Sequence, residues 1–371
     1  MLTSIKLKQL ILISSLICPS LHGWWFDIVP IKKIIEQHPE ILYQKCFDEL
    51  QFSLNSFTPD PTEPNQGSFK ECFIVTIPDG VVQSEYGFTV INKKFIQEMI
   101  WGDQPHSLRH VKNLNPVTII KVPGKVAVIT QVAYFNYYHW LIEVLGRLAL
   151  LEMHNIQYDW LYVQKNTPLM KKTLELWGIN PSKIISPPQR DSFAIQADQI
   201  ILPSYLINTN IGFSFAHPCT TTYVKNKLVS AVKEKNTPHS FSKKVFISRQ
   251  DTHRRITNED DIFQVLKCHG FKKYTLSSLS IEDQILLFDG ADIVIGEHGA
   301  GLVNIIFCKP NTHIIEIFQA LKTTCFWSLA NMLNLKYTAI KTMEFEPNYM
   351  TAWRSQAEVP LDQFYELLKT L

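Results

Sequence analysis

Short apolar runs and longer amphipathic segments alternate along most of this chain. The runs are rich in β-branched residues, which is typical of buried strands. Between them, apolar residues recur at three- and four-residue spacing, which predicts helices with one buried face. Alternation of strand and helix predicts mostly parallel sheets covered by helices, and so an α/β fold.

The first α/β segment covers residues 121–235. The pattern predicts strands at 125–130, 160–163, 183–185 and 199–202, and helices at 138–153, 170–177 and 221–235. Residues 236–242 are polar and include a proline, as expected of a linker between domains.

A second α/β segment covers residues 243–345. Its predicted strands are 244–248, 271–276, 291–295, 313–318 and 337–340, and its predicted helices are 257–268, 280–288, 300–307 and 320–333. Thr257 and Ser280 are the predicted helix caps. The last segment, 346–371, contains a predicted helix from 360 onward that we expect to pack back on the first domain.

Residues 24–120 form an N-terminal extension and the start of the first domain, with a helix near 31–37 and short strands at 72–77 and 87–91. Residues 1–23 differ from the rest. Two lysines precede a short apolar run and then small residues, which predicts a signal-like targeting segment or a shallow membrane anchor. The run is short for a membrane span, and an amphipathic or buried first helix is the alternative.

Composition narrows the function classes. The chain has 371 residues, is 46% hydrophobic and has a formal net charge of +2, so it can bury two cores and has no overall field that favours nucleic acid. The seven cysteines lack metal-finger spacing, and Cys268 and Cys308 are predicted to be buried thiols. The absence of an Asn-x-Ser/Thr acceptor favours a compartment other than a eukaryotic secretory lumen.

Candidate chemistry is concentrated first at Glu297-His298-Gly299-Ala300-Gly301, between a predicted strand and a predicted helix. Free backbone N–H groups and the positive end of the helix dipole favour anions there, above all phosphates. The alternative is that the glycines only permit a tight turn and that His298 is a hydrogen-bonded core residue.

A second motif, Ser248 to Glu259, gathers Arg249, Arg254 and Arg255 between a strand end and a helix start. Arginine binds phosphate with two parallel hydrogen bonds, so such a cluster can neutralise a diphosphate. A solvated basic loop is the alternative.

A third motif opens the helix at 138–153. His139 and Glu143 are four residues apart and share one helix face, where either could act as a general base toward an alcohol. Arg147 could bind phosphate or pair with Glu143. The alternative is a surface network beside an aromatic core.

These motifs, taken in order with Glu316-Ile317, resemble glycosyltransferase family 61 over roughly residues 120–340. The resemblance implies a GT-B architecture, in which two Rossmann-like domains face each other across a cleft. It also implies inverting, metal-independent transfer from a nucleotide sugar, as co-substrate, to a hydroxyl of a glycan or glycoconjugate. Gly146 departs from the family, whose members often carry proline before the arginine.

On this hypothesis the donor-binding residues are Arg249, Arg254, Arg255, Glu297, His298, Gly299, Ala300, Gly301 and Glu316. The arginines and the glycine turn would hold the diphosphate, His298 would touch phosphate or sugar, and Glu316 or Glu297 would bind the ribose. Either His139 or Glu143 would remove the acceptor proton. His139 is slightly preferred, because an imidazole changes charge near neutral pH.

Two other function classes compete with a transferase. A nucleotide-sugar-binding protein would keep the arginines and the glycine turn without a base. A phosphoesterase would use His298 and His253 but would need a nucleophile or metal ligands nearby. A nucleotide-sugar donor suits the cytoplasmic face of a bacterial inner membrane, whereas the signal-like segment leaves export open.

Overall fold

A computed structural model describes residues 27–57, 64–92, 94–99, 119–189, 193–206, 217–235, 240–318, 323–342 and 356–369. The signal-like segment predicted at 1–23 lies outside them. Within these ranges no helix is long and apolar enough to cross a bilayer. The chain divides into two compact units, one of Met1–Leu50 with Phe69–Ile207 and one of Gln51–Ser68 with Asn208–Leu371.

A mixed sheet forms the first unit, with strand order β1-β8-β7-β6-β12-β9-β10-β11 and with β5 and β2 attached beside β12. Four adjacent strands are parallel: β12 (Ala194–Pro203), β9 (Ile119–Val128), β10 (Trp160–Tyr162) and β11 (Ile184–Ile185). Numbered along the chain and read from β11 to β12, they lie in the order 3-2-1-4, which matches the first four positions of the Rossmann order 3-2-1-4-5-6. The predicted parallel core is therefore present.

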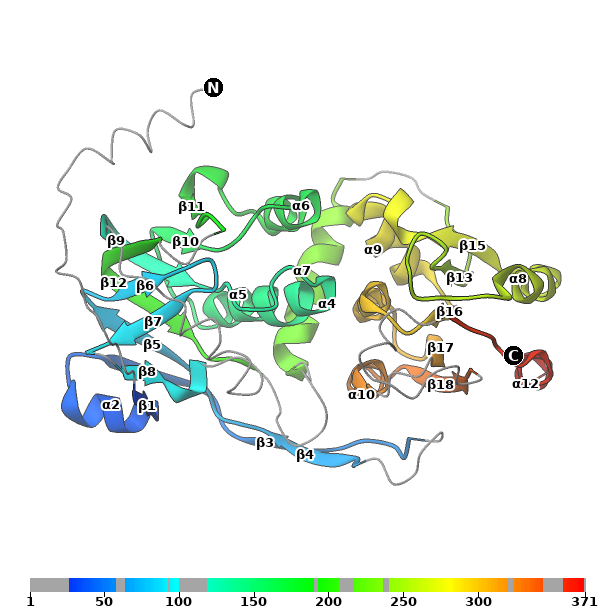
Figure 1. The fold of residues 1–371 in the computed structure, drawn as a ribbon, viewed down its shortest axis with the longest axis horizontal. Helices are drawn as coiled ribbons and strands as arrows, with labels where there is room; N and C mark the ends of the chain where they lie inside the picture. Colours follow the sequence, from blue (N-terminus) through cyan, green and yellow to red (C-terminus); the bar gives the residue numbers. More distant parts are fainter. Residues whose placement is uncertain are drawn as a thin grey trace. The chain divides into compact units, whose positions relative to one another are not determined.

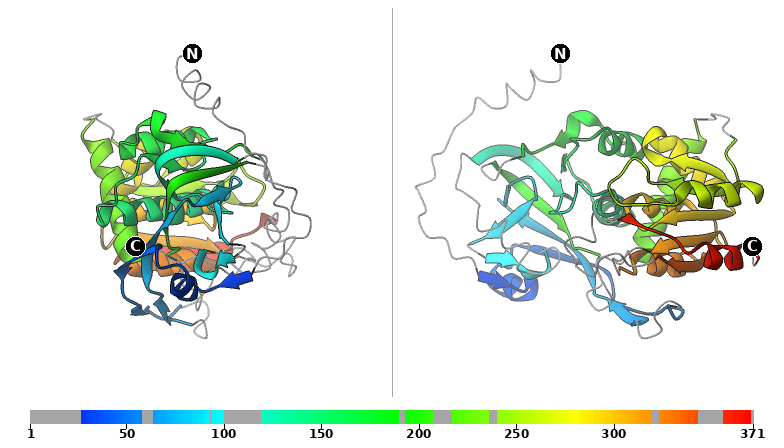
Figure 2. Two further views of the ribbon diagram at one scale, coloured as in Figure 1. Left: turned by 90° about the vertical axis from the view of Figure 1, so that its left-hand side faces the viewer. Right: turned by 45° about the vertical axis from the view of Figure 1, so that its right-hand side comes forward.

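Strands from the N-terminal region continue the same sheet. They are β1 (Asp27–Val29), β2 (Leu42–Phe47), β5 (Cys72–Pro78), β6 (Val81–Gln83), β7 (Phe88–Ile91) and β8 (Lys94–Ile96). Strands β5 and β6 run antiparallel to β12, and the views in Figure 2 show them beside it. The predicted strands at 72–77 and 87–91 are confirmed as β5 and β7. Both belong to the first sheet.

The first unit's helices are α2 (Ile31–Gln37), α4 (Tyr137–His139), α5 (Leu145–Met153) and α6 (Pro168–Trp177). Between α4 and α5 lies a π-helical turn, η2 (Trp140–Val144), closed by the Leu145 N–H donating to the Trp140 carbonyl. The predicted helix at 138–153 is thus confirmed with an unpredicted π turn inside it. Such turns are frequent at functional sites, because the extra residue re-aims side chains.

The second unit is a five-stranded parallel sheet of order β15-β13-β16-β17-β18 (Figure 1). Its strands are β13 (Lys244–Ser248), β15 (Lys272–Thr275), β16 (Ile293–Glu297), β17 (His313–Phe318) and β18 (Lys336–Lys341). The chain order 2-1-3-4-5 places the topological switch point between β13 and β16. Ligands of open α/β sheets bind beyond the carboxyl ends of the strands at such a point.

Helices cover both faces of this sheet (Figures 1 and 2). On one face α8 (Glu259–Cys268) and α12 (Leu361–Leu368) share a buried cluster with Phe246, Ile295 and Ile315. On the other face α7 (Pro218–Lys233), α9 (Ile281–Gly290), α10 (Cys325–Met332) and η5 (Ala300–Phe307) pack together. Two expectations need correction. Helix α12 packs on the second sheet, because Phe364 and Leu368 are buried there, and α7 belongs to the second unit.

Further local predictions were wrong. Helix α8 has Asn258, not Thr257, at its N-cap position, without a side-chain cap. The segment predicted as an α-helix at 300–307 is a 3-10 helix. Cys308 is buried as predicted, but Cys268 is exposed. The Ser280 cap of α9 is confirmed, since its hydroxyl accepts from the Asp283 N–H at 3.0 Å.

Strands β3 (Leu50–Ser53) and β4 (Gln66–Phe69) pair with each other, and the segment Gln51–Ser68 belongs to the second unit. Phe57, which follows β3, packs its ring 5.7 Å from that of Phe318 and 5.4 Å from that of Trp327. The N-terminal region thus supplies apolar side chains to the second unit as well as strands to the first.

Candidate functional site

Arg249 and Gly299 lie in the turns that follow β13 and β16, at the switch point of the second sheet. The Arg249 guanidinium donates through Nη1 to the His298 carbonyl at 3.0 Å and through Nε to the Arg254 carbonyl at 3.2 Å. A Cβ added to Gly299 would overlap Arg249 Nη1. The two turns that the sequence singled out separately are therefore one structure, held by the arginine side chain.

Arg254 is buried, with 7% of its surface exposed. Burial first, and then the neighbouring Arg249 charge, lower the pKa of Arg254 to about 10. Two guanidinium groups are therefore held close together in a partly dry environment, where each raises the cost of the other's charge. An anion bound between them would relieve that repulsion.

Glu297 ends β16 beside these arginines and is 2% exposed. Burial raises the pKa of its carboxyl to about 7, although the Ile256 N–H, Arg249 and Arg254 oppose that shift. The carboxyl group consequently changes charge near neutral pH, directly beside the arginines.

His298 is buried and hydrogen-bonded on both sides of its ring. Its Nδ1 is paired with the Glu316 carboxylate and its Nε2 lies 2.7 Å from the Thr323 hydroxyl. Glu316 has 0% of its surface exposed, and its second oxygen accepts from the Tyr337 hydroxyl at 2.6 Å. Glu316 thus fixes the His298 ring through Nδ1, and its complete burial suits orientation of the imidazole better than contact with a ribose.

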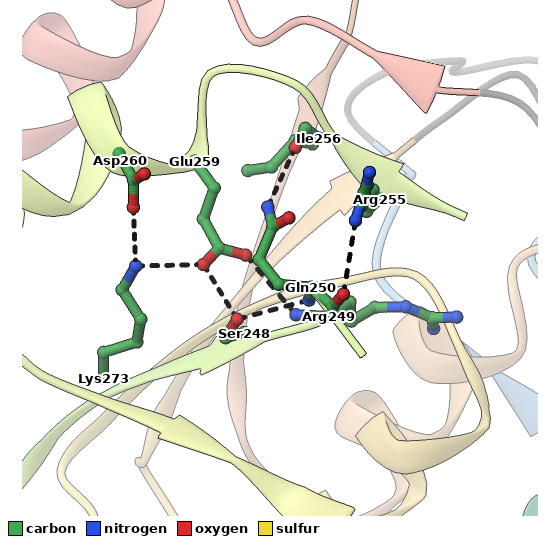
Figure 3. Close-up of polar contacts among 8 residues, drawn as sticks. All are labelled: Ser248, Arg249, Gln250, Arg255, Ile256, Glu259, Asp260 and Lys273. Carbon is green, nitrogen blue, oxygen red and sulfur yellow. Dashed lines mark hydrogen bonds and ion pairs between the residues drawn. The ribbon is translucent and has the colours of Figure 1, made fainter. Parts of the chain in front are cut away.

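A polar brace fixes the carboxyl end of β13 (Figure 3). Glu259, at the first position of α8, accepts from the Ser248 hydroxyl at 2.8 Å and from Lys273 Nζ at 3.1 Å. Arg255 points to a different partner, the Gln250 carbonyl, at 3.3 Å. The structure therefore groups Arg249 and Arg254, with Arg255 in a separate position.

The 3-10 helix η5 begins directly after Gly299. The Leu302 N–H donates back to the Gly299 carbonyl at 2.8 Å, which leaves the N–H groups of Ala300 and Gly301 without a carbonyl of their own helix. The expected helix start after Gly299 is thus present, as a 3-10 helix rather than an α-helix. His253, in contrast, is exposed on the loop after β13.

The first unit carries its own polar cluster at the π turn. His139 Nδ1 lies 2.6 Å from Glu143 Oε1, and Glu143 Oε2 accepts from Gln131 Nε2 at 2.7 Å. Glu143 is 3% exposed, whereas the His139 ring is partly exposed. The predicted pair is therefore formed, and it faces the carboxyl end of β9 because Gln131 follows that strand.

Arg147, one turn further, is fully engaged in the fold. It donates through Nε to the Pro203 carbonyl at 3.0 Å and through Nη1 to the Thr130 carbonyl at 2.9 Å. Its guanidinium also stacks 4.8 Å from the centre of the Tyr205 ring. This arginine links the carboxyl ends of β9 and β12. Its role is therefore structural, and the expected phosphate contact or direct ion pair with Glu143 does not describe it.

Sequence reasoning missed four residues that complete these clusters. They are Gln131, Glu259, Thr323 and Tyr337, each hydrogen-bonded to a candidate residue or its strand. Glu259 is the last residue of the second motif, Ser248 to Glu259. The other three lie on separate loops and strands, and no sequence pattern marks them. Over the described ranges, no group of three or more His, Cys, Asp or Glu side chains has a metal-binding arrangement.

Comparison with known proteins bears on both clusters. Residues 137–315 match the family described as Glycosyltransferase 61. This segment, a little under half of the chain, is therefore similar to glycosyltransferase family 61. The match includes His139 and Glu143 and extends through Arg249, Arg254 and His298 into β17, so this family segment contains most of both polar clusters.

Curated relatives share this segment at low identity. An "EGF domain-specific O-linked N-acetylglucosamine transferase" of Drosophila melanogaster is 29% identical over 97 residues, 25% of this chain and 18% of the relative. A "Beta-1,2-xylosyltransferase" of Arabidopsis thaliana is 27% identical over 131 residues, 32% of this chain and 23% of the relative. The chain spans about a fifth of the length of the curated relatives it matches.

Proposed function

We propose that this protein is a glycosyltransferase that moves a sugar from a nucleotide-sugar donor to a hydroxyl group of a glycan or glycoconjugate. The family match and the transferase names of the relatives support this class of reaction. The observation that carries the proposal is the joining of Arg249, Arg254 and the Gly299 turn at the switch point of a parallel sheet. Nucleotide diphosphates bind at such positions in open α/β sheets.

At the donor site, Arg249 and Arg254 would neutralise the diphosphate, and the N–H groups at the start of η5 would bind its oxygens. Glu297 would take the ribose, because Glu316 is buried beneath His298. His298 would lie against the phosphate or the transferred sugar. Arg255, which points to the Gln250 carbonyl, would have a peripheral part.

At the acceptor side, His139 would be the base and Glu143 would hold its ring. The carboxylate on Nδ1 leaves the proton to be taken by the other ring nitrogen, an arrangement common in His-carboxylate pairs. In the proposed step the acceptor oxygen attacks the anomeric carbon, the bond to the diphosphate breaks and the hydroxyl proton passes to His139. A single displacement of this kind inverts the anomeric centre.

The proposal includes metal-independent transfer and the GT-B arrangement of the two units. Two arginines and the backbone N–H groups would supply the positive charge that the leaving diphosphate requires. Magnesium would then change the rate of transfer little.

The test is a transfer assay with a panel of nucleotide sugars and mixed oligosaccharide acceptors, with magnesium or with a chelator, read by release of the nucleoside diphosphate. We expect one donor class to be consumed and NMR of the product to show the inverted anomer. Donor binding without turnover would favour a non-catalytic binding protein. Release of phosphate from simple phosphoesters would favour a phosphoesterase, and either result would overturn the proposal.

A further inference from the structure

The Tyr134 hydroxyl in the first unit gathers three planar polar side chains from three different loops. It donates to Glu85 Oε2 at 2.5 Å and accepts from Gln189 Nε2 at 3.3 Å and from Asn166 Nδ2 at 3.4 Å. Tyr134, Asn166 and Gln189 follow β9, β10 and β11, so they lie beyond the carboxyl ends of three adjacent parallel strands.

An exposed aromatic ring lies beside this group. Phe135 is 70% exposed, the largest exposed fraction among the large hydrophobic residues in the described ranges. Its ring centre is 5.9 Å from that of Tyr134, which in turn is 6.4 Å from that of Tyr86. A single exposed apolar residue is ordinary on a protein surface. Here, however, the ring adjoins a set of oriented polar groups.

The polar groups are anchored to Tyr134 and still have hydrogen-bonding capacity for a ligand. Tyr134 is 2% exposed and its hydroxyl already donates one hydrogen bond and accepts two, so it serves as the support. Gln164, buried behind the group, donates to the Pro187 carbonyl at 2.8 Å and also reaches Glu85 Oε2. Asn166 and Gln189 are exposed, and each uses an amide hydrogen on Tyr134, which leaves its amide oxygen as an acceptor.

The chemistry of this arrangement fits a sugar ring. A pyranose or pentose ring has a face of C–H groups, which packs on the negative face of an aromatic ring, and a rim of hydroxyl groups. Carboxylates and amides recognise such hydroxyl groups because they offer planar pairs of donor and acceptor positions. A phosphate would instead meet the Glu85 carboxylate and would be repelled.

We propose that Phe135, with Glu85, Asn166 and Gln189, forms a carbohydrate subsite that holds a neutral sugar ring of the acceptor. That the bound sugar belongs to the acceptor rests on the proposed function, but the carbohydrate subsite itself does not. The loop 131–136 that carries Phe135 also carries Gln131, which binds Glu143 at 2.7 Å. A sugar on Phe135 would thus contact the same short loop that positions Glu143, the partner of the proposed catalytic base His139.

The test is saturation-transfer NMR of the full chain with methyl glycosides of glucose, galactose, xylose and N-acetylglucosamine. We expect at least one of them to receive saturation at its C–H face, and Phe135→Ala to reduce that signal at least fivefold. Phe135→Trp should retain it, and Glu85→Gln should weaken it. Tyr365→Ala, which removes an aromatic ring that is 49% exposed on α12, is the matched control and should leave it unchanged.

A parallel titration with nucleoside diphosphates separates this inference from the proposed function. Phe135→Ala should bind nucleotide as the parent protein does. Glycoside binding that Phe135→Ala abolishes supports the subsite even if no nucleotide binds. Absence of any glycoside signal at millimolar concentration, or a signal that Phe135→Ala leaves intact, would overturn the subsite even if the donor site is active.

Discussion

The Arg249 guanidinium occupies the space that a side chain on Gly299 would need. A Cβ at Gly299 would overlap Nη1, which donates to the neighbouring His298 carbonyl. The backbone at Gly299 is extended, with φ 170°, so its conformation does not require glycine. The close approach of the arginine does, and this contact links the turns after β13 and β16.

Gly299→Ala should therefore displace Arg249 and weaken binding of a nucleoside diphosphate at least tenfold, which corresponds to about 1.4 kcal/mol or more. Gly301→Ala is the matched control. A Cβ there would lie 2.9 Å from the end of the flexible Leu276 side chain, which can move away. Calorimetric titration of both variants measures the difference. Equal affinities in the two variants would show that the contact does not shape the site.

Glu297 should make stability depend on pH in a defined direction. Its folded-state pKa of about 7 lies above the ordinary value of 4.5, so between these values the folded protein keeps a proton that the unfolded chain has lost. The contribution of Glu297 to the free energy of unfolding therefore falls as pH rises from about 5 to 7 and is constant above that.

Glu297→Gln, which is neutral at every pH, isolates this effect. Urea unfolding should show the parent protein losing stability relative to the variant between pH 5 and pH 8. The effect of the substitution on binding of a nucleoside diphosphate should also differ between pH 6 and pH 8, because the parent carboxylate is charged at pH 8. A difference in unfolding free energy between parent and variant that is the same at pH 5 and pH 8 would contradict the raised pKa of Glu297.

His139 and Glu143 should differ in how their loss affects catalysis. His139→Ala removes the proposed base and should lower kcat by about 100-fold to 10,000-fold. Glu143→Gln keeps the shape but changes the partner of Nδ1, so a smaller fall with an altered pH profile is expected. Neither variant should change donor affinity. His269→Ala, on an exposed histidine of α8's C-terminal end, is the control. Unchanged turnover in both site variants would remove this base from the mechanism.

Arg147 should matter for stability. Lysine cannot donate to the Pro203 and Thr130 carbonyls with the same fork, so Arg147→Lys leaves one buried acceptor unsatisfied and should cost about 1–3 kcal/mol of unfolding free energy. Arg255→Lys is the control, since its single hydrogen bond to the Gln250 carbonyl is exposed. Urea unfolding measures both, and equal small effects would contradict the structural role.

Much of the fold follows from periodicity. The apolar runs at 244–248 and 313–318 became β13 and β17 with unchanged bounds, since both strands are largely buried and their patterns end at polar turns. Cys268 was predicted to be buried from its place in a helical pattern, but it comes two residues after the buried Leu266 and so lies on the opposite, exposed side of α8. The π turn at Trp140–Val144 could not be predicted, because its residues also fit an α-helix.

The candidate site was predictable only where the key side chains are close in sequence. His139 and Glu143 share a helix face, so their contact follows from spacing. The contact of Arg249 with the Gly299 turn depends on β13 lying beside β16, a pairing that spacing alone does not give. Tyr337 reaches Glu316 from the neighbouring strand β18, and only the register of the sheet reveals it.

The most direct test of the proposed donor site is a thermal-shift titration of the purified chain with nucleoside diphosphates, in parallel with Arg254→Ala. A nucleotide present at about a hundred times its dissociation constant should stabilise the folded protein by roughly 2.7 kcal/mol. We predict that one nucleotide class raises the melting temperature of the parent protein without magnesium. The Arg254→Ala variant should fold but show no such rise. No shift with any nucleotide, or an equal shift in Arg254→Ala, would contradict a donor site at the carboxyl ends of β13 and β16.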